Sequence, residues 1–253
     1  MRIGLFTDTY LPDVNGVVSS IVTLQQELEK NGQQVFVITT HPGMQIVRED
    51  HVLRLPGVEL KSLYGYVLTS PIHFAALKDI REMKLEVIHA HTEFGVGIFA
   101  RIVAKMLQLP LVSTYHTTYE DYTHYVNVLH LDSIDKVAKK AVGSLSKLYG
   151  DSCTELIAPS QKTKEMLQRY GIRKRIHVIP TGLDLRRFDR SRTDEQQRRS
   201  IRSELMPDPD QLLIVFVGRI AKEKSIDFVI DGFAAAGQVR GAPYSWLGAR
   251  GGQ

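Results

Sequence analysis

The sequence predicts an α/β fold in which a Rossmann-like parallel sheet carries helices on both faces, followed by the first strand and helix of an incomplete second Rossmann-like domain. Two observations support this prediction. Short apolar runs alternate with longer segments whose apolar residues follow helical spacing, up to about residue 181. A new pattern of strand, turn and helix then begins near Gln211, after a polar stretch. Strands that alternate with helices form a parallel sheet whose carboxyl ends share one edge, where ligands bind.

The first domain is expected to span residues 1–181. Val17–Lys30 illustrates the reasoning, because its apolar residues share one helical face and Asn31-Gly32 supplies a C-terminal cap. The expected strands are Ile3–Thr7, Gln34–Thr40, Glu86–Ala90, Leu111–Tyr115, Glu155–Ala158 and Arg175–Ile179. The other expected helices are Ile72–Lys84, Phe94–Leu107, Leu131–Tyr149 and Ser160–Tyr170.

Residues 182–209 are expected to link the two domains, because this stretch is rich in Arg and Asp and poor in apolar residues. Some helix is expected near Glu195–Leu205. Residues 210–236 form the start of the second domain, in which strand Leu212–Val217 is expected to have an unpaired edge. Residues 237–253 contain five glycines and show no helical or strand period, so an irregular tail is expected.

The composition is that of an ordinary soluble globular protein, with 43% hydrophobic and 24% charged residues. A net charge of +4 favours phosphate-bearing partners without choosing among them. The single cysteine, Cys153, permits no intrachain disulfide, and no apolar run approaches membrane-spanning length. These observations predict a cytoplasmic protein and argue against the disulfide-stapled and transmembrane classes.

The loop after the first expected strand has the features of an anion site. Pro12 stiffens it, and Gly16 allows the backbone to approach a ligand at the start of the next helix, where free amides attract anions. A dinucleotide-binding fold would show G-x-G-x-x-G here and an acidic residue after the second strand, and this sequence has neither. On spacing alone, an ordinary connecting loop remains an equal alternative.

Several segments together resemble the amino-terminal domain of the retaining glycosyltransferases of family 4, which have the two-domain GT-B fold. The first is the P-D-V-N-G-V loop with its flanking strand and helix. The others follow in order as His89–Phe94, Ser113–Tyr122, Ile157–Ser160, Val178–Asp184 and Phe216–Lys224. The resemblance runs from Met1 to about Phe233. Within the family, the chain is most similar to the bacterial diacylglycerol glucosyltransferases, which make glycolipids from UDP-glucose.

This resemblance implies an enzyme that transfers a hexose, glucose, with retention of configuration from a nucleotide sugar to a lipid acceptor such as diacylglycerol. It implies no cofactor and no metal, since UDP-glucose is a substrate. The expected partners are the nucleotide sugar, the lipid acceptor and an anionic membrane surface, with peripheral attachment to the inner face of the cell membrane. Nucleic acid is not expected, because the basic residues of the linker alternate with acidic ones and no aromatic series accompanies them.

The resemblance also assigns roles to residues. Gly16, with Asn15 beside it, would lie beneath the donor diphosphate and the acceptor. His116 would face the transferred sugar and stabilise charge at its reacting face. Arg219 and Lys224 would neutralise the diphosphate leaving group, as paired cations can do without a metal. In front-face transfer the leaving phosphate takes the acceptor's proton, so no protein base is implied.

Asp121 and Tyr122 are implied as acceptor contacts. His89 and His91 are expected to divide between the core and the ligand edge, with a structural role for His89 and ligand contact for His91. The H-x-H pair could suggest a metal site, but no third ligand stands at a convincing spacing.

The functional roles of the basic residues have plainer alternatives. Arg219 could pair with a nearby carboxylate, and Lys222–Lys224 could be a solvated helix start. Helix Leu131–Tyr149 could lie on an anionic bilayer through its lysines or simply pack its apolar stripe on the sheet. That stripe consists of Leu131, Ile134, Ala138, Ala141, Val142, Leu145 and Leu148.

The chain departs from the family after Lys224. The family carries a late pair of glutamates that holds the nucleotide ribose and the sugar, and no such pair stands here. A truncated or frame-shifted product is therefore expected, with doubtful activity at this length. The alternative function is a non-catalytic acceptor- or membrane-binding remnant. A third alternative, a sugar epimerase or phosphorylase of similar fold, is not supported, because the sequence shows no catalytic carboxylate placed for such a reaction.

Overall fold

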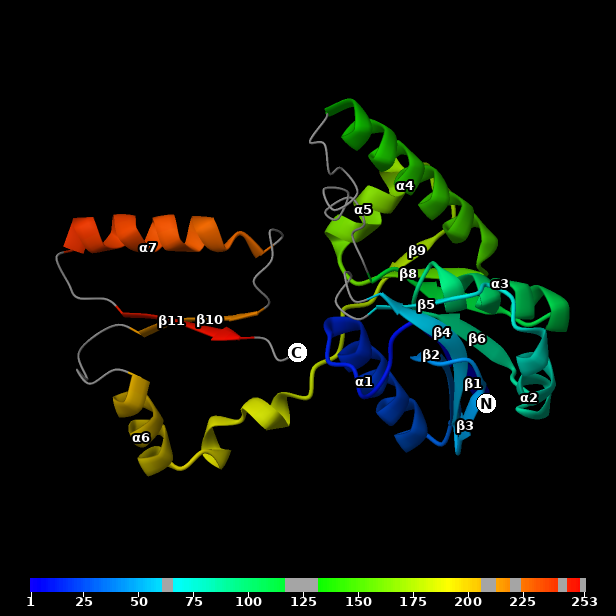
Figure 1. Ribbon diagram of the computed structural model, residues 1–253, viewed down its shortest axis with the longest axis horizontal. Helices are drawn as coiled ribbons and strands as arrows, with labels where there is room; N and C mark the ends of the chain where they lie inside the picture. Colours follow the sequence, from blue (N-terminus) through cyan, green and yellow to red (C-terminus); the bar gives the residue numbers. More distant parts are fainter. Residues whose placement is uncertain (61–65, 117–131, 206–212, 219–223, 241–244, 251–253) are drawn as a thin grey trace. The chain divides into compact units, whose positions relative to one another are not determined.

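The computed structural model divides into two units, Met1–Leu183 and Asp184–Gln253, which are described separately (Figure 1). It describes the whole chain except residues 61–65, 117–131, 206–212, 219–223, 241–244 and 251–253.

The first unit is built on a nine-stranded sheet with the order β3-β4-β2-β1-β6-β7-β8-β9, in which β5 also pairs with β4. Strands β3 and β5 run antiparallel to β4, and the other pairings are parallel. The strands are β1 (Arg2–Phe6), β2 (Gln34–Pro42), β3 (Val47–Glu49), β4 (Val52–Leu60), β5 (Tyr66–Thr69), β6 (Val87–Ala90), β7 (Leu111–Thr114), β8 (Glu155–Ala158) and β9 (Ile176–Val178).

Helices cover both faces of this sheet. They are α1 (Gly16–Lys30), the short 3-10 helix η2 (Phe74–Ala76), α2 (Leu77–Glu82), α3 (Gly95–Leu107), α4 (Asp132–Ser152) and α5 (Gln161–Arg169) (Figure 1). Helix α1 packs Ile21 against Ile3 and Leu5 of β1 on one face. On the other face, Phe6 of β1 lies in a larger core that includes Phe99 of α3. Successive residues of β1 thus feed two cores, as expected for a strand buried on both faces.

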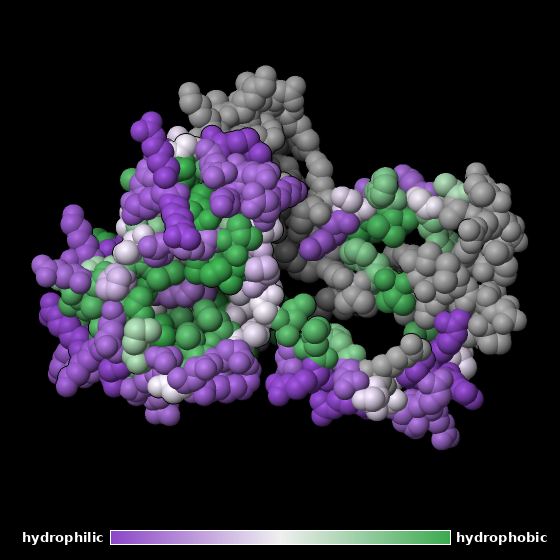
Figure 2. Space-filling model, turned by 180° about the vertical axis from the view of Figure 1, so that it is seen from behind, coloured by the Kyte–Doolittle hydropathy of each residue, from purple (hydrophilic) through white to green (hydrophobic). Residues whose placement is uncertain are grey.

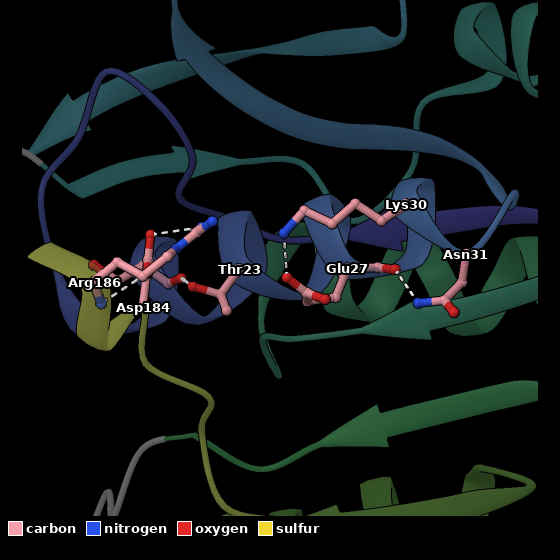
Figure 3. Close-up of polar contacts among 7 residues, drawn as sticks. Thr23, Glu27, Lys30, Asn31, Asp184 and Arg186 are labelled. Carbon is pink, nitrogen blue, oxygen red and sulfur yellow. Dashed lines mark hydrogen bonds and ion pairs between the residues drawn. The ribbon is translucent and has the colours of Figure 1, made fainter.

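Helix α1 has polar caps at both ends. At its N-terminus, the side-chain oxygen of Asn15 accepts a hydrogen bond of 2.9 Å from the backbone amide of Val18. At its C-terminus, the side-chain amide of Asn31 donates to the carbonyl of Glu27 at 2.7 Å, and Lys30 pairs with the Glu27 carboxylate (Figure 3). The Asn15 cap sets where α1 begins, directly after the loop that follows β1, and the Asn31 cap sets where it ends.

The second unit is smaller. It contains the 3-10 helices η4 (Leu185–Phe188) and η5 (Arg190–Arg192), then α6 (Glu195–Leu205), β10 (Leu213–Gly218), α7 (Ile226–Arg240) and β11 (Ser245–Arg250). Strands β10 and β11 pair in parallel, so β10, α7 and β11 form a βαβ unit. Near its start, Arg186 pairs with Asp184 in an exposed contact (Figure 3).

Three elements differ from the sequence-based expectations. Strands β3, β4 and β5 occupy a region for which no element is predicted, because Pro56 and Gly57 interrupt the apolar pattern of β4. The predicted helix Ile72–Lys84 is shorter, beginning as η2 and ending at Glu82. The region beyond Gly237 is not irregular throughout, since α7 continues to Arg240 and Ser245–Arg250 form β11. Strand β10 therefore has a partner along one edge.

Candidate functional site

The candidate site lies where the order of the sheet reverses. Strand β1 has β2 on one side and β6 on the other, so Phe6 pairs with Ile38 in one direction and Ala90 in the other. The chain leaves β1 towards β2 and later returns to β6, which makes the gap between β1 and β6 a topological switch point. Ligands of open parallel sheets bind at such points, outside the carboxyl ends of the strands. We call this rim of β1, β6 and β7 the carboxyl edge.

Three histidines gather at the carboxyl edge from two neighbouring strands. His89 lies in β6, His91 follows that strand, and His116 follows β7. The rings of His89 and His91 have centroids 4.0 Å apart, and the rings of His91 and His116 are stacked at 5.2 Å. His91 Nδ1 and His116 Nε2 share a hydrogen bond of 2.9 Å, and His89 Nε2 contacts the Thr114 hydroxyl at 2.7 Å. The structure thus brings the predicted site residues His91 and His116 into direct contact.

The expected division of His89 and His91 between core and ligand edge is wrong. Residues two apart on a strand point to the same side of the sheet, so their rings stack instead of separating. His91 is also only 2% exposed, and its contact with the site passes through His116. Of the hydrogen-bonded pair His91 and His116, the more accessible residue is His116, which is partly buried.

Burial keeps the three imidazoles neutral. It lowers the pKa of His116 to about 4 and that of His89 to about 3, where nearby His116 adds a smaller effect. The pKa of His91 also lies well below its usual value, first through burial and then through the two neighbouring histidines. A neutral imidazole has one N–H donor and one bare acceptor nitrogen. Near neutral pH this cluster therefore offers directed hydrogen bonds and no net charge.

Asp8 is a buried acidic residue at the same edge that sequence reasoning missed. It lies just beyond β1 and is 2% exposed. Its Oδ1 accepts a hydrogen bond of 2.8 Å from the backbone amide of Val96 in the first turn of α3. Burial raises the pKa of Asp8, while the Val96 amide and the side chains of Thr92 and Tyr66 oppose that rise. Its position directly after the first strand was the available signal.

Gly95 and Gly97 allow α3 to approach this edge closely. A Cβ atom on Gly95 would lie 2.5 Å from Asp8 Oδ1, and Gly95 has a positive φ of 23°. A Cβ atom on Gly97 would lie 1.8 Å from the carbonyl oxygen of Thr92. Both distances are too short for real contacts, so side chains at these positions would push α3 away from Asp8 and the end of β6.

Gly16 and Asn15 lie at the start of α1, after β1. Gly16 is exposed, and no atom stands within 4 Å of the position that its Cβ would occupy. Asn15 donates to the hydroxyl of Thr9 at 3.0 Å and accepts from Val18, so its side chain is engaged within the loop. The amides of Val18 and Ser19 are hydrogen-bonded to Asn15, and the start of α1 has open space on the Cβ side of Gly16, at the end of the helix that favours anions.

The remaining predicted residues have no described place at this site. Asp121, Tyr122 and Arg219 lie outside the described residues. Lys224 is exposed in the second unit, before α7. Within the described part of the chain, no group of three or more His, Cys, Asp or Glu side chains is arranged to hold a metal ion.

The helix for which membrane contact and packing on the sheet are the two alternatives is present as α4, and its described half is not uniformly apolar on one side. Ser146 and Tyr149 are buried, whereas Leu148 of the predicted stripe is 63% exposed.

Seen from behind, the first unit shows hydrophobic residues in green gathered on one face with hydrophilic residues around them (Figure 2). Among the described helices, none combines the length and apolar character needed to cross a membrane.

Comparison with known proteins gives a family match over residues 14–187, to Glycosyltransferase Family 4. The chain is 37% identical over 236 residues to the alpha-monoglucosyldiacylglycerol synthase of Acholeplasma laidlawii, covering 92% of this chain and 59% of that protein. It is 35% identical over 235 residues to the enzyme of the same name from Streptococcus pneumoniae, covering 92% of this chain and 52% of that protein. The chain therefore spans between half and three-fifths of the length of these relatives.

Solved structures show the same fold at low identity. Sucrose-phosphate synthase from Thermosynechococcus elongatus aligns with a TM-score of 0.64 and 17% identity, over 99% of this chain and 62% of that one. The catalytic domain of starch synthase IV from Arabidopsis thaliana aligns with a TM-score of 0.60 and 13% identity, over 98% of this chain and 68% of that one. With its family match and these relatives, the chain belongs to glycosyltransferase family 4.

Proposed function

We propose that this chain forms the acceptor-side part of a retaining glycosyltransferase that moves glucose from UDP-glucose to a lipid acceptor such as diacylglycerol. The observation that carries the proposal is the neutral pair of His91 and His116 at the topological switch point, where the ligands of such sheets bind. The names of the relatives support the choice of sugar and acceptor, because both are alpha-monoglucosyldiacylglycerol synthases.

The transfer would break the bond between the sugar C1 and the diphosphate oxygen, and would form a bond from C1 to the acceptor hydroxyl oxygen on the same face. The acceptor's proton would pass to the leaving phosphate, so the reaction balances without a protein base. The start of α1 at Gly16, where the space beside the backbone is open, would bind the diphosphate. Arg219 and Lys224 would neutralise it as it leaves, which is the role that the family resemblance implies for them. Asp121 and Tyr122 would contact the acceptor.

A neutral His116 suits this chemistry better than a charged one. Positive charge develops at C1 as the diphosphate departs, and an imidazolium beside it would oppose that charge. The burial that lowers the pKa of His116 to about 4 prevents this repulsion near neutral pH. His116 would thus act through a hydrogen bond to a sugar oxygen, positioning the sugar rather than supplying charge.

Radiolabelled UDP-glucose and vesicles of diacylglycerol and phosphatidylglycerol test the proposal directly. The expected result is label in the organic phase as glucosyldiacylglycerol, with an α-anomeric signal by NMR, and no label from GDP-mannose. His116→Ala and Arg219→Ala are each expected to reduce turnover by about 100-fold. His177→Ala is the matched control, because this histidine pairs with Glu155 between β8 and β9, away from the switch point.

Two outcomes would contradict the proposal. Turnover that is the same in His116→Ala as in the unchanged protein would remove the histidine pair from the reaction. Vesicle binding without any transfer of label would instead favour the non-catalytic function, an acceptor- or membrane-binding module.

A further inference from the structure

The histidine cluster contains a buried nitrogen that the proposed reaction leaves unexplained. His91 uses Nδ1 to contact His116, and its Nε2 is buried with no hydrogen-bond partner among the described residues. The ring is held on both sides, by His89 at 4.0 Å and by His116 at 5.2 Å. His89 is itself anchored to the Thr114 hydroxyl at 2.7 Å. The imidazole of His91 therefore has a defined orientation, but its Nε2 lacks a hydrogen-bond partner in the described part of the chain.

One proton couples the protonation of His91 Nε2 to the tautomer of His116 at the carboxyl edge. Only one hydrogen can lie between His91 Nδ1 and His116 Nε2, which are 2.9 Å apart. If His91 donates it, His91 Nε2 is a bare acceptor and His116 carries its own hydrogen on Nδ1. If His116 donates it, His91 Nε2 must carry a hydrogen and His116 Nδ1 is bare. The tautomer of one ring thus determines the tautomer of the other, because both are neutral.

The first arrangement is favoured by the surroundings of His91. In the second, a buried N–H donor would have no acceptor, and orphaned buried N–H groups are rarer in proteins than unsatisfied acceptors. A neutral histidine side chain in water prefers its hydrogen on Nε2. In the first arrangement both rings carry it on Nδ1, so the site would hold both in their less common tautomer. The hydrogen bond between the two rings forms in either arrangement, so the buried His91 Nε2, which has no acceptor beside it among the described residues, is what favours this form.

We propose that His91 is a positioning residue that holds His116 in its Nδ1–H tautomer, so that His116 presents an N–H donor at the carboxyl edge. The inference rests on the proposed function only where that donor meets a sugar oxygen. A donor can bind any sugar oxygen through a lone pair, whereas a bare nitrogen requires a hydroxyl hydrogen that points towards it. His91 would act entirely through His116 and would not touch the substrate.

Nuclear magnetic resonance of the full chain labelled with 15N-histidine tests the tautomer without requiring turnover. The chain has nine histidines, and the His116 signals are assigned by their loss in His116→Gln. At neutral pH, His116 is expected to show a protonated Nδ1 and a bare Nε2. A protonated Nε2 in the unchanged protein would overturn the inference, whether or not the enzyme turns over.

Variants of His91 test whether this residue is the cause. His91→Phe keeps a ring in the stack but has no donor, so His116 is expected to revert to the common Nε2–H form and kcat to fall about tenfold with little change in KM. His91→Asn places an amide near the position of Nδ1 and is expected to restore the Nδ1–H form. His177→Phe is the matched control, because it replaces a histidine that pairs with Glu155 and leaves all three rings of the cluster unchanged.

The outcomes separate this inference from the proposed function. An Nδ1–H form that persists in His91→Phe would overturn the role of His91. If His91→Phe does not fold, the spectrum of the unchanged protein and that of His91→Asn still decide the question. Absence of glucosyl transfer with the expected tautomers would contradict the proposed function alone.

Discussion

Individual histidines at the carboxyl edge differ from surface histidines in how they respond to pH. Their pKa values in the folded protein lie below the ordinary 6.5, at about 3 for His89 and about 4 for His116. The unfolded chain would bind protons at these side chains near the ordinary value. Between the two values the unfolded state holds more protons than the native state, so acid favours unfolding.

These histidines are therefore not expected to reduce the free energy of unfolding above pH 6.5. Below that pH the free energy of unfolding should fall as the pH drops towards about 4. Each buried histidine contributes a slope of up to about 1.4 kcal/mol per pH unit in that window. Urea unfolding across the window should give a flatter dependence for His116→Gln than for the unchanged protein. Equal slopes for His116→Gln and the unchanged protein would show that His116 protonates in the folded state.

Two glycines at the edge should respond in opposite ways to the same substitution. Gly16→Ala meets no atom within 4 Å and should change stability by less than about 1 kcal/mol, while a methyl group at the proposed diphosphate site should weaken UDP binding. Gly97→Ala places its Cβ 1.8 Å from a backbone oxygen and should destabilise the fold by about 1–3 kcal/mol. Thermal unfolding and calorimetric UDP titration measure both. Unchanged UDP affinity in Gly16→Ala would remove Gly16 from the donor site.

Among the elements, α3 depends on a residue outside itself for the cap of its first turn. Asp8, beyond β1, accepts from the Val96 amide at 2.8 Å and so ties the helix to the neighbouring strand. The cap needs an acceptor oxygen, which either a carboxylate or a neutral amide can supply. Burial raises the pKa of this carboxyl, which shows that the site disfavours its charge. The link explains how β1 and the β6–α3 turn hold one shape at the switch point.

Asp8→Ala should lower the free energy of unfolding by about 1–2 kcal/mol more than Asp8→Asn, which keeps the acceptor. Urea unfolding at neutral pH measures the difference. If Asp8→Asn destabilises as much as Asp8→Ala, the negative charge, rather than the acceptor geometry, is what the helix requires.

Sequence periodicity located most strands of the first sheet. It failed where the apolar pattern is interrupted and where a contact depends on the register between strands. The strand Glu155–Ala158 and the helix Glu195–Leu205 have the predicted bounds, because their patterns are uninterrupted. Strand β4 was missed since Pro56 and Gly57 break its pattern. The contact between His91 and His116 could not be foreseen, because it depends on β6 lying beside β7 in a particular register. The error at His89 came from applying the strand period wrongly, and it could have been avoided.

Across the whole molecule, burial is distributed unevenly between the two units. Every buried residue of both hydrophobic cores lies in the first unit, among the described side chains. In the second unit, Phe228 is 78% exposed and Ile230 is 48% exposed. A sheet of two strands with one crossover helix has little apolar surface to bury, so its independent stability should be low.

Hydrogen exchange followed by mass spectrometry should therefore show faster exchange in β10 than in β1 and β6 at neutral pH. Amides of β1 are expected to exchange at rates set by global unfolding, and those of β10 by local opening. Equal protection in β1 and β10 would contradict the assignment of lower stability to the second unit.

The position of β1 in the middle of the sheet has a consequence for biosynthesis. Strand β1 leaves the ribosome before either of its neighbours; β2 follows soon, but the other neighbour is β6, where Ile3 pairs with Val87. At ordinary translation speeds the nascent chain would wait about 3–10 s between these two events. During that interval one side of β1 stays unpaired, which makes this a moment when chaperones would be most useful to the growing polypeptide.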